Sequence, residues 1–130
     1  MNKYLVERRE KVIFPQSGTS FVPNCLAVRE DLSQIANADK EQRTLCAQTA
    51  AGLAIDLRSF LTNWKLMPFV KAGSLASSEI DAQADLFLAL ARELGGDSEV
   101  EAALSEIESI KNSSIRKMSE MGLNLSLIHI

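Results

Sequence analysis

Residues 46–64, CAQTAAGLAIDLRSFLTNW, contain the longest amphipathic pattern in the chain. Apolar residues recur there at alternating steps of four and three, namely Cys46, Ala50, Leu53, Leu57, Phe60 and Trp64. This spacing places them on one face of an α-helix. Beside that face lie small residues that would let a neighbouring helix approach closely, namely Ala47, Ala51 and Ala54. We therefore predict a central helix that Asp39 caps and that runs to about Leu66, just before the helix-breaking Pro68.

Three further amphipathic segments accompany this helix. The first begins at Pro23-Asn24, with Asn24 as its cap, and ends near Asn37. The second begins at Ser77 or Ser78 and stops at Gly95-Gly96. The third begins with a Ser98-x-x-Glu capping pattern and continues to about Gly122. Because the loops are short, we expect an all-α fold, a helical bundle of about four principal helices. Alternatively, the last two helices form a hairpin that pairs with a second copy.

The two ends of the chain differ from this helical domain, which we place at residues 25–124. Residues 1–24 hold short apolar clusters, charges and a Pro15-x-Ser17-Gly18 turn signal, so we expect an irregular, extended N-terminal arm. A helix over residues 3–12 is the alternative. Residues 125–130, LSLIHI, resemble the in-frame translation of a transposon end used in sequencing libraries. We therefore expect a non-native tail there, and a natural chain that continues past Asn124; a genuine amphiphilic tail is the alternative.

Composition narrows the classes of function. Apolar residues make up 46% of the chain and aromatic residues 5%, and the net charge of −3 gives no global footprint for nucleic acid. The only histidine, His129, lies in the suspected tail, so no serine or cysteine triad is available elsewhere. Two cysteines, Cys25 and Cys46, cannot form a tetrathiolate zinc site, and we expect both to be buried thiols. We expect no cofactor and lean against an enzyme.

Location and candidate contacts follow from smaller features. The chain shows neither a signal peptide nor an apolar run long enough for a membrane span, so we expect a cytoplasmic protein away from membranes.

Apolar and aromatic residues that could form a partner-binding surface are Trp64, Met67, Phe69, Met118 and Met121. Basic residues of the arm that could contact nucleic acid are Lys3, Arg8, Arg9 and Lys11. Three acids lie near the start of the helix predicted to begin at Ser77 or Ser78, namely Glu79, Asp81 and Asp85. They fit the helix dipole better than a cation site.

These observations favour a non-enzymatic helical interaction or assembly module that acts through apolar helix faces. Its partner would be another protein or a second copy of the chain, and nucleic acid is the less favoured partner. Two alternatives remain open at this point. One is a nucleic-acid-associated accessory or regulatory protein that uses the basic arm. The other is the N-terminal helical part of a larger enzyme.

Overall fold

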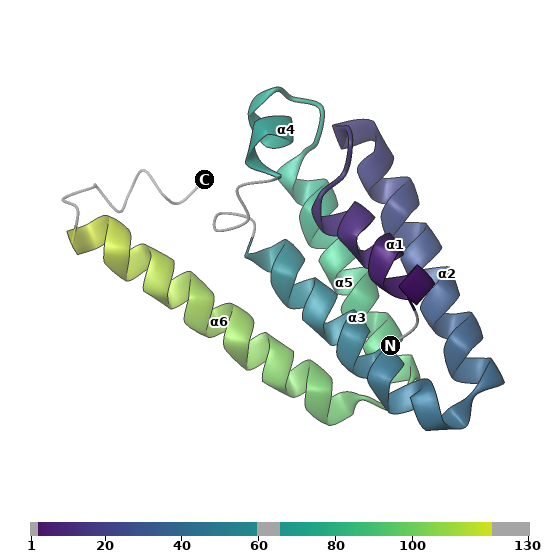
Figure 1. The fold of residues 1–130 in the computed structure, drawn as a ribbon. Coiled ribbons are helices and arrows are strands. Elements are labelled where there is room, and N and C mark those ends of the chain that lie inside the picture. Colours follow the sequence, from purple (N-terminus) through teal and green to yellow (C-terminus); the bar gives the residue numbers. More distant parts are fainter. Residues whose placement is uncertain (1–2, 60–65, 121–130) are drawn as a thin grey trace.

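The computed structural model describes residues 3–59 and 66–120, and for residues 3–5 and 114–120 it describes the backbone alone. Within these ranges the chain forms helices and no strand, which confirms the all-α prediction. Figure 1 shows the arrangement of the α-helices, which are α1 (Lys3–Ile13), α2 (Phe21–Ala38), α3 (Arg43–Arg58), α4 (Met67–Lys71), α5 (Ser77–Glu93) and α6 (Asp97–Glu120). Short 3-10 turns precede α2 and α3.

Helix α3 is the centre of the bundle, as the sequence predicts. It packs most extensively against α5 and also contacts α1, α2 and α6. The predicted core residues Leu53 and Leu57 are fully buried, together with Leu32 of α2 and Phe87 of α5. Asp39 caps the entry to α3 through its side chain, which accepts a hydrogen bond from the Glu41 N–H at 3.0 Å. The range predicted for α5 is also confirmed.

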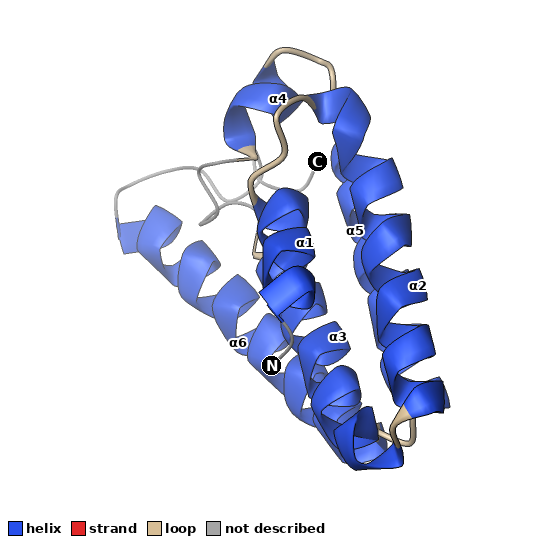
Figure 2. Ribbon diagram, turned by 45° about the vertical axis from the view of Figure 1, so that its right-hand side comes forward, coloured by secondary structure: helices blue, strands red, loops and turns tan. Residues whose placement is uncertain are grey.

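The predicted extended N-terminal arm is wrong, and the alternative of a helix over residues 3–12 is confirmed. Helix α1 packs against α2 and α3, as Figure 2 shows, and its Val12 side chain is fully buried. The β-branched Val12-Ile13 pair suggested a strand, but packing against two helices outweighs such a weak local preference.

Polar contacts hold α1 against α2 and α3. Adjacent arginines reach different helices: Arg8 pairs with Asp31 of α2 at 3.6 Å, and Arg9 pairs with Asp56 of α3 at 3.2 Å. At the end of α1, the Asn24 amide donates a hydrogen bond to the Lys11 carbonyl at 3.1 Å. This bond satisfies one of the carbonyls that a helix C-terminus leaves without an intrahelical partner.

The start of α2 also differs from the prediction. The helix begins at Phe21, so Asn24 lies within its first turns and does not cap it. Pro23 is tolerated there because the first N–H groups of a helix lack intrahelical acceptors. Helix α2 therefore runs without interruption across the boundary expected between residues 24 and 25. Val12 of α1 and Phe21 of α2 belong to the same core as the later helices, and Phe21 is the larger of these two side chains.

Helix α3 ends at Arg58, eight residues before the predicted end at Leu66. The Ser59 hydroxyl donates hydrogen bonds to the Ile55 carbonyl at 2.8 Å and the Asp56 carbonyl at 3.1 Å. A serine side chain that bonds to these carbonyls competes with the continuing helix ladder. Pro68 lies in the first turn of α4, which begins at Met67, and it does not terminate α3; proline fits the first turn of a helix. The predicted stripe positions Phe60 and Trp64 lie outside the described residues.

The turn from α5 to α6 uses both glycines of the predicted stop. Gly95 has φ +82°, and the Gly96 N–H donates to the Ala91 carbonyl at 2.9 Å, which is the Schellman arrangement at a helix C-terminus. Gly96 is required for a different reason, because an added Cβ would lie 2.7 Å from the Ala47 Cβ. The small residues of α3 are buried and thus allow a neighbouring segment of the chain to approach closely, as the sequence predicts.

Helix α6 begins at Asp97, one residue before the predicted cap Ser98. The Ser98 hydroxyl donates to the Glu99 carboxylate at 2.9 Å, so the expected capping box is not the contact observed. Among the described residues, no helix has the length and apolarity needed to cross a membrane.

Candidate interaction surfaces

A shallow groove of about 420 Å³ lies between α2 and α5 and is the first candidate site. Its apolar side comes from α5, which contributes Leu86, Ala89 and Leu90. Its polar side comes mainly from α2, with Glu93 of α5 at the rim; the α2 residues are Arg29, Glu30, Ser33 and Gln34. Leu86 is 45% exposed, although it is a large apolar residue.

The apolar surface continues beyond the groove along α2. Leu26 is 49% exposed and Val22 is 37% exposed. Val22, Leu26, Arg29 and Ser33 follow one another at steps of four, three and four, so they share the helix face that borders the groove. Contiguous apolar surface on a folded chain marks interaction sites more often than isolated exposed side chains do.

Arg29 closes the inner side of this groove. Its guanidinium donates a hydrogen bond to the Gln83 side-chain oxygen and lies 5.4 Å from the centroid of the Phe87 ring. Burial lowers the pKa of the guanidinium, and the neighbouring Cys25 and Glu30 raise it. An arginine over an aromatic face gains cation–π attraction. Its charge is thus engaged inside the bundle, while the carboxylates of Glu30 and Glu93 remain exposed at the rim.

The apolar stripe of α6 is the second candidate surface. Val100 and Ala103, near the start of the helix, are buried against the bundle. Farther along the same stripe Leu104 is 43% exposed, and Ile107 and Ile110 are half-buried. In Figure 1 the helix leans away from α3 toward its C-terminal end, so these three side chains are covered less than Val100 and Ala103 are.

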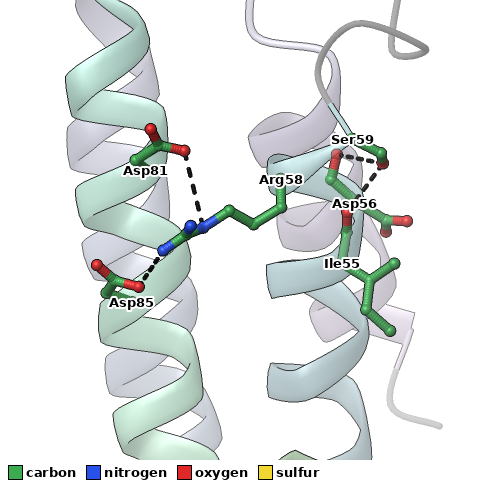
Figure 3. Close-up of polar contacts among 6 residues, drawn as sticks. All are labelled: Ile55, Asp56, Arg58, Ser59, Asp81 and Asp85. Carbon is green, nitrogen blue, oxygen red and sulfur yellow. Dashed lines mark hydrogen bonds and ion pairs between the residues drawn. The ribbon is translucent and has the colours of Figure 1, made fainter. Parts of the chain in front are cut away.

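Two of the acids near the start of α5 form ion pairs with α3. Arg58 of α3 reaches across to α5 and pairs with Asp85 and, at 3.7 Å, with Asp81, as Figure 3 shows. These three side chains tie the end of α3 to the first half of α5. Among the described residues, no group of three or more His, Cys, Asp or Glu side chains could hold a metal ion.

Both cysteines are buried and free, as predicted. Burial raises the pKa of the Cys25 thiol to about 12, although the nearby Arg29 charge acts in the opposite direction. Burial also raises the pKa of the Cys46 thiol, with a further contribution from Asp39. A thiol that resists ionisation is a poor nucleophile, so neither cysteine has the environment of a reactive residue.

The residues predicted for partner binding are not brought together as one surface within the described part of the chain. Met67 and Phe69 are half-buried in α4, and Phe69 packs against the core. Trp64 and Met121 lie outside the described residues, and Met118 is described by its backbone alone. That predicted site stays a prediction.

Residues predicted to contact nucleic acid have other contacts here. Arg8 and Arg9 pair with Asp31 and Asp56, Lys11 is exposed, and the Lys3 side chain lies outside the described part. Two adjacent arginines held by acids of their own chain offer less free charge to phosphates. The nucleic-acid contact also stays a prediction.

Sequence reasoning missed Leu26, Leu86 and Leu104 as surface residues. A usable signal was present, because Leu26 and Leu86 fall off the main apolar stripes of their helices and stand among polar neighbours. A large apolar residue on a polar helix face is the pattern to look for.

Comparison with known proteins found no family model, no curated protein and no solved structure that matches this chain.

Proposed function

We propose that this chain is a helical interaction module that binds an amphipathic, basic helix of a partner protein in the α2–α5 groove. The observation that supports this most is the exposure of Leu26 and Leu86 beside a groove whose rim is acidic. The two free, buried thiols fit a reducing compartment such as the cytoplasm.

The apolar part of the groove favours a helical occupant. Leu86 and Leu90 are spaced by one turn on α5, and Leu26 extends the apolar surface along the neighbouring α2. A partner helix that presents apolar residues at steps of three and four could set them along this line. Its burial would remove exposed leucine surface from water, which is the main driving force for such docking.

Charge specifies the flanks of that partner. Glu30 and Glu93 stand at the rim with exposed side chains, and Glu79 is exposed on the same face of α5. Arg29, the cation that lines the groove, is hydrogen-bonded to Gln83 and stacked on Phe87. Lysines or arginines beside the apolar residues of the partner would therefore meet exposed carboxylates, which favours a basic helix over an acidic one.

The test uses two designed helical peptides of about 18 residues, or five turns. Both present the same leucine stripe, one flanked by lysines and the other by glutamates. We expect the lysine peptide to bind the full chain, with amide shift changes that concentrate on α2 and α5 in NMR titrations. The double variant Leu26→Gln, Leu86→Gln should raise the dissociation constant of the lysine peptide by about tenfold or more, because exposed apolar anchors are lost.

Leu45→Gln is the matched control, since Leu45 of α3 is 48% exposed and does not line the groove. This variant should bind the lysine peptide as the parent chain does. Equal loss of binding in Leu45→Gln and in the groove variant would contradict the proposal, because it would indicate unspecific attraction. Equal binding of the glutamate peptide would contradict the proposed basic partner.

A further inference from the structure

We infer that α6 pairs in antiparallel orientation with α6 of a second copy of this chain, through the stripe formed by Leu104, Ile107 and Ile110. This assembly surface is separate from the proposed partner groove, because α6 packs against α3 and α5 and contributes no residue to the groove. The inference rests on the exposure of the stripe and on the order of charges along the helix.

The apolar stripe is longer than the surface that the bundle covers. Val100 and Ala103 use its first part for contact with the rest of the chain. Leu104, Ile107 and Ile110 follow at steps of three on the same side of the helix, and all three keep exposed surface. A second helix laid along them would bury apolar side chains at the spacing used in helix pairs.

The charges change sign along α6. Residues 97–108 contain no lysine or arginine and have the acids Asp97, Glu99, Glu101, Glu106 and Glu108. Residues 109–120 contain one acid, Glu120, and the bases Lys111, Arg116 and Lys117. The helix dipole accounts for Asp97 and Glu99 in the first turn, but its effect decays within one turn. Glu106 and Glu108 lie about three turns into the helix, beyond the reach of that effect.

The order of charges distinguishes the possible arrangements of two α6 helices. In a parallel pair the acidic half of one copy would lie beside the acidic half of the other, and this like-charge contact is unfavourable. In an antiparallel pair whose two-fold axis lies between Ile107 and Ile110, the acidic half of each copy faces the basic half of its partner. A second copy of this chain therefore supplies both the apolar surface and the complementary charge that the stripe requires.

The experiment is sedimentation equilibrium of the full chain over the micromolar range, at low and at high salt. We expect the average mass to rise with concentration from 14.3 kDa toward twice that value at low salt. High salt should weaken the association, because exposed charge pairs are screened. A chain that stays monomeric at every concentration would overturn the inference.

Charge-reversal variants test the orientation. Glu106→Lys with Glu108→Lys should raise the dissociation constant by about tenfold or more, because the acidic half would then repel the basic half of its partner. The control is Ser105→Lys with Ser109→Lys, which adds positive charge at exposed positions on the opposite face and should leave the constant within about threefold. Unchanged or stronger association of the Glu106→Lys, Glu108→Lys chain would overturn the inference.

Mixing two variants gives a second, independent readout. Lys111→Glu with Lys117→Glu should associate poorly alone, as should Glu106→Lys with Glu108→Lys. Their mixture should associate at least as strongly as the parent chain, since each supplies the charge that the other lacks. Circular dichroism of each variant checks that α6 is retained. Failure of the mixture to associate, with helix content unchanged, would overturn the inference and leave the α2–α5 groove untouched.

Discussion

Helices α1 and α6 show opposite relations between local sequence and tertiary contact. Helix α1 has a highly charged centre and gave an ambiguous signal, yet it is fixed by a buried valine, two ion pairs and a bond from Asn24 to a carbonyl at its end. Helix α6 is long and strongly amphipathic, yet within residues 97–113, whose side chains the structure describes, the fully buried stripe residues are Val100 and Ala103. Amphipathic periodicity thus indicates that a helix forms, and it leaves open how much of that helix its own chain covers.

The first prediction contrasts a buried with an exposed leucine. Leu53→Ala in α3 should lower the free energy of unfolding by about 2–5 kcal/mol, because it leaves a cavity in the core that α3 shares with its neighbours. Leu104→Ala in α6 should change it by no more than about 0.5 kcal/mol, since that side chain is 43% exposed. Urea unfolding of both variants measures the difference. Similar losses in the two chains would mean that α6 is packed more fully than described here.

The second prediction concerns the integration of α1. Val12→Ala should lower the free energy of unfolding by about 2 kcal/mol, because two buried methyl groups and their contacts are lost. The unfolding transition should remain single, since α1 shares one core with α2 and α3. Val6→Ala, at a half-exposed position on the same helix, is the control. An unchanged midpoint for Val12→Ala would indicate that α1 does not contribute to stability.

The third prediction tests the junction that attaches α6. Gly96→Ala should cost about 1–3 kcal/mol, because the new methyl group would overlap the Ala47 side chain. Removing that methyl group in the double variant Ala47→Gly, Gly96→Ala should recover part of the loss, beyond the cost of about 1 kcal/mol for glycine within a helix. A double-mutant cycle in thermal unfolding gives the coupling. Additive losses would show that these two residues are not in contact.

The smallest expected effect belongs to the ion pair of α1. Arg9→Met should lower the free energy of unfolding by about 0.2–1 kcal/mol, because the Arg9–Asp56 pair is partly exposed. The loss should shrink at high salt, and Asp56→Asn in the Arg9→Met background should add little. If Arg9→Met lowers the free energy of unfolding by the same amount at low and at high salt, the effect comes from packing of the arginine stem and not from its charge.

Local patterns were sufficient for much of the helical framework. The span of α5, the stop at Gly95-Gly96 and the burial of Leu53 and Leu57 all follow from features within a few residues: apolar steps of three and four, and glycine in a left-handed turn. Such features act within one or two helical turns. They can therefore be recognised in a single sequence without knowledge of what lies beside each helix.

The candidate surfaces required information from distant parts of the chain. Whether Leu26, Leu86 and Leu104 are covered depends on neighbours that their own helices do not specify. The same holds for α1, since Arg9 and Asp56 are 47 positions apart and meet only when the bundle forms. Sequence by itself determined where most of the helices form and which faces are apolar. Tertiary structure alone decided which apolar faces are used within the chain and which stay exposed, because burial depends on how all the helices fit together and on no local pattern.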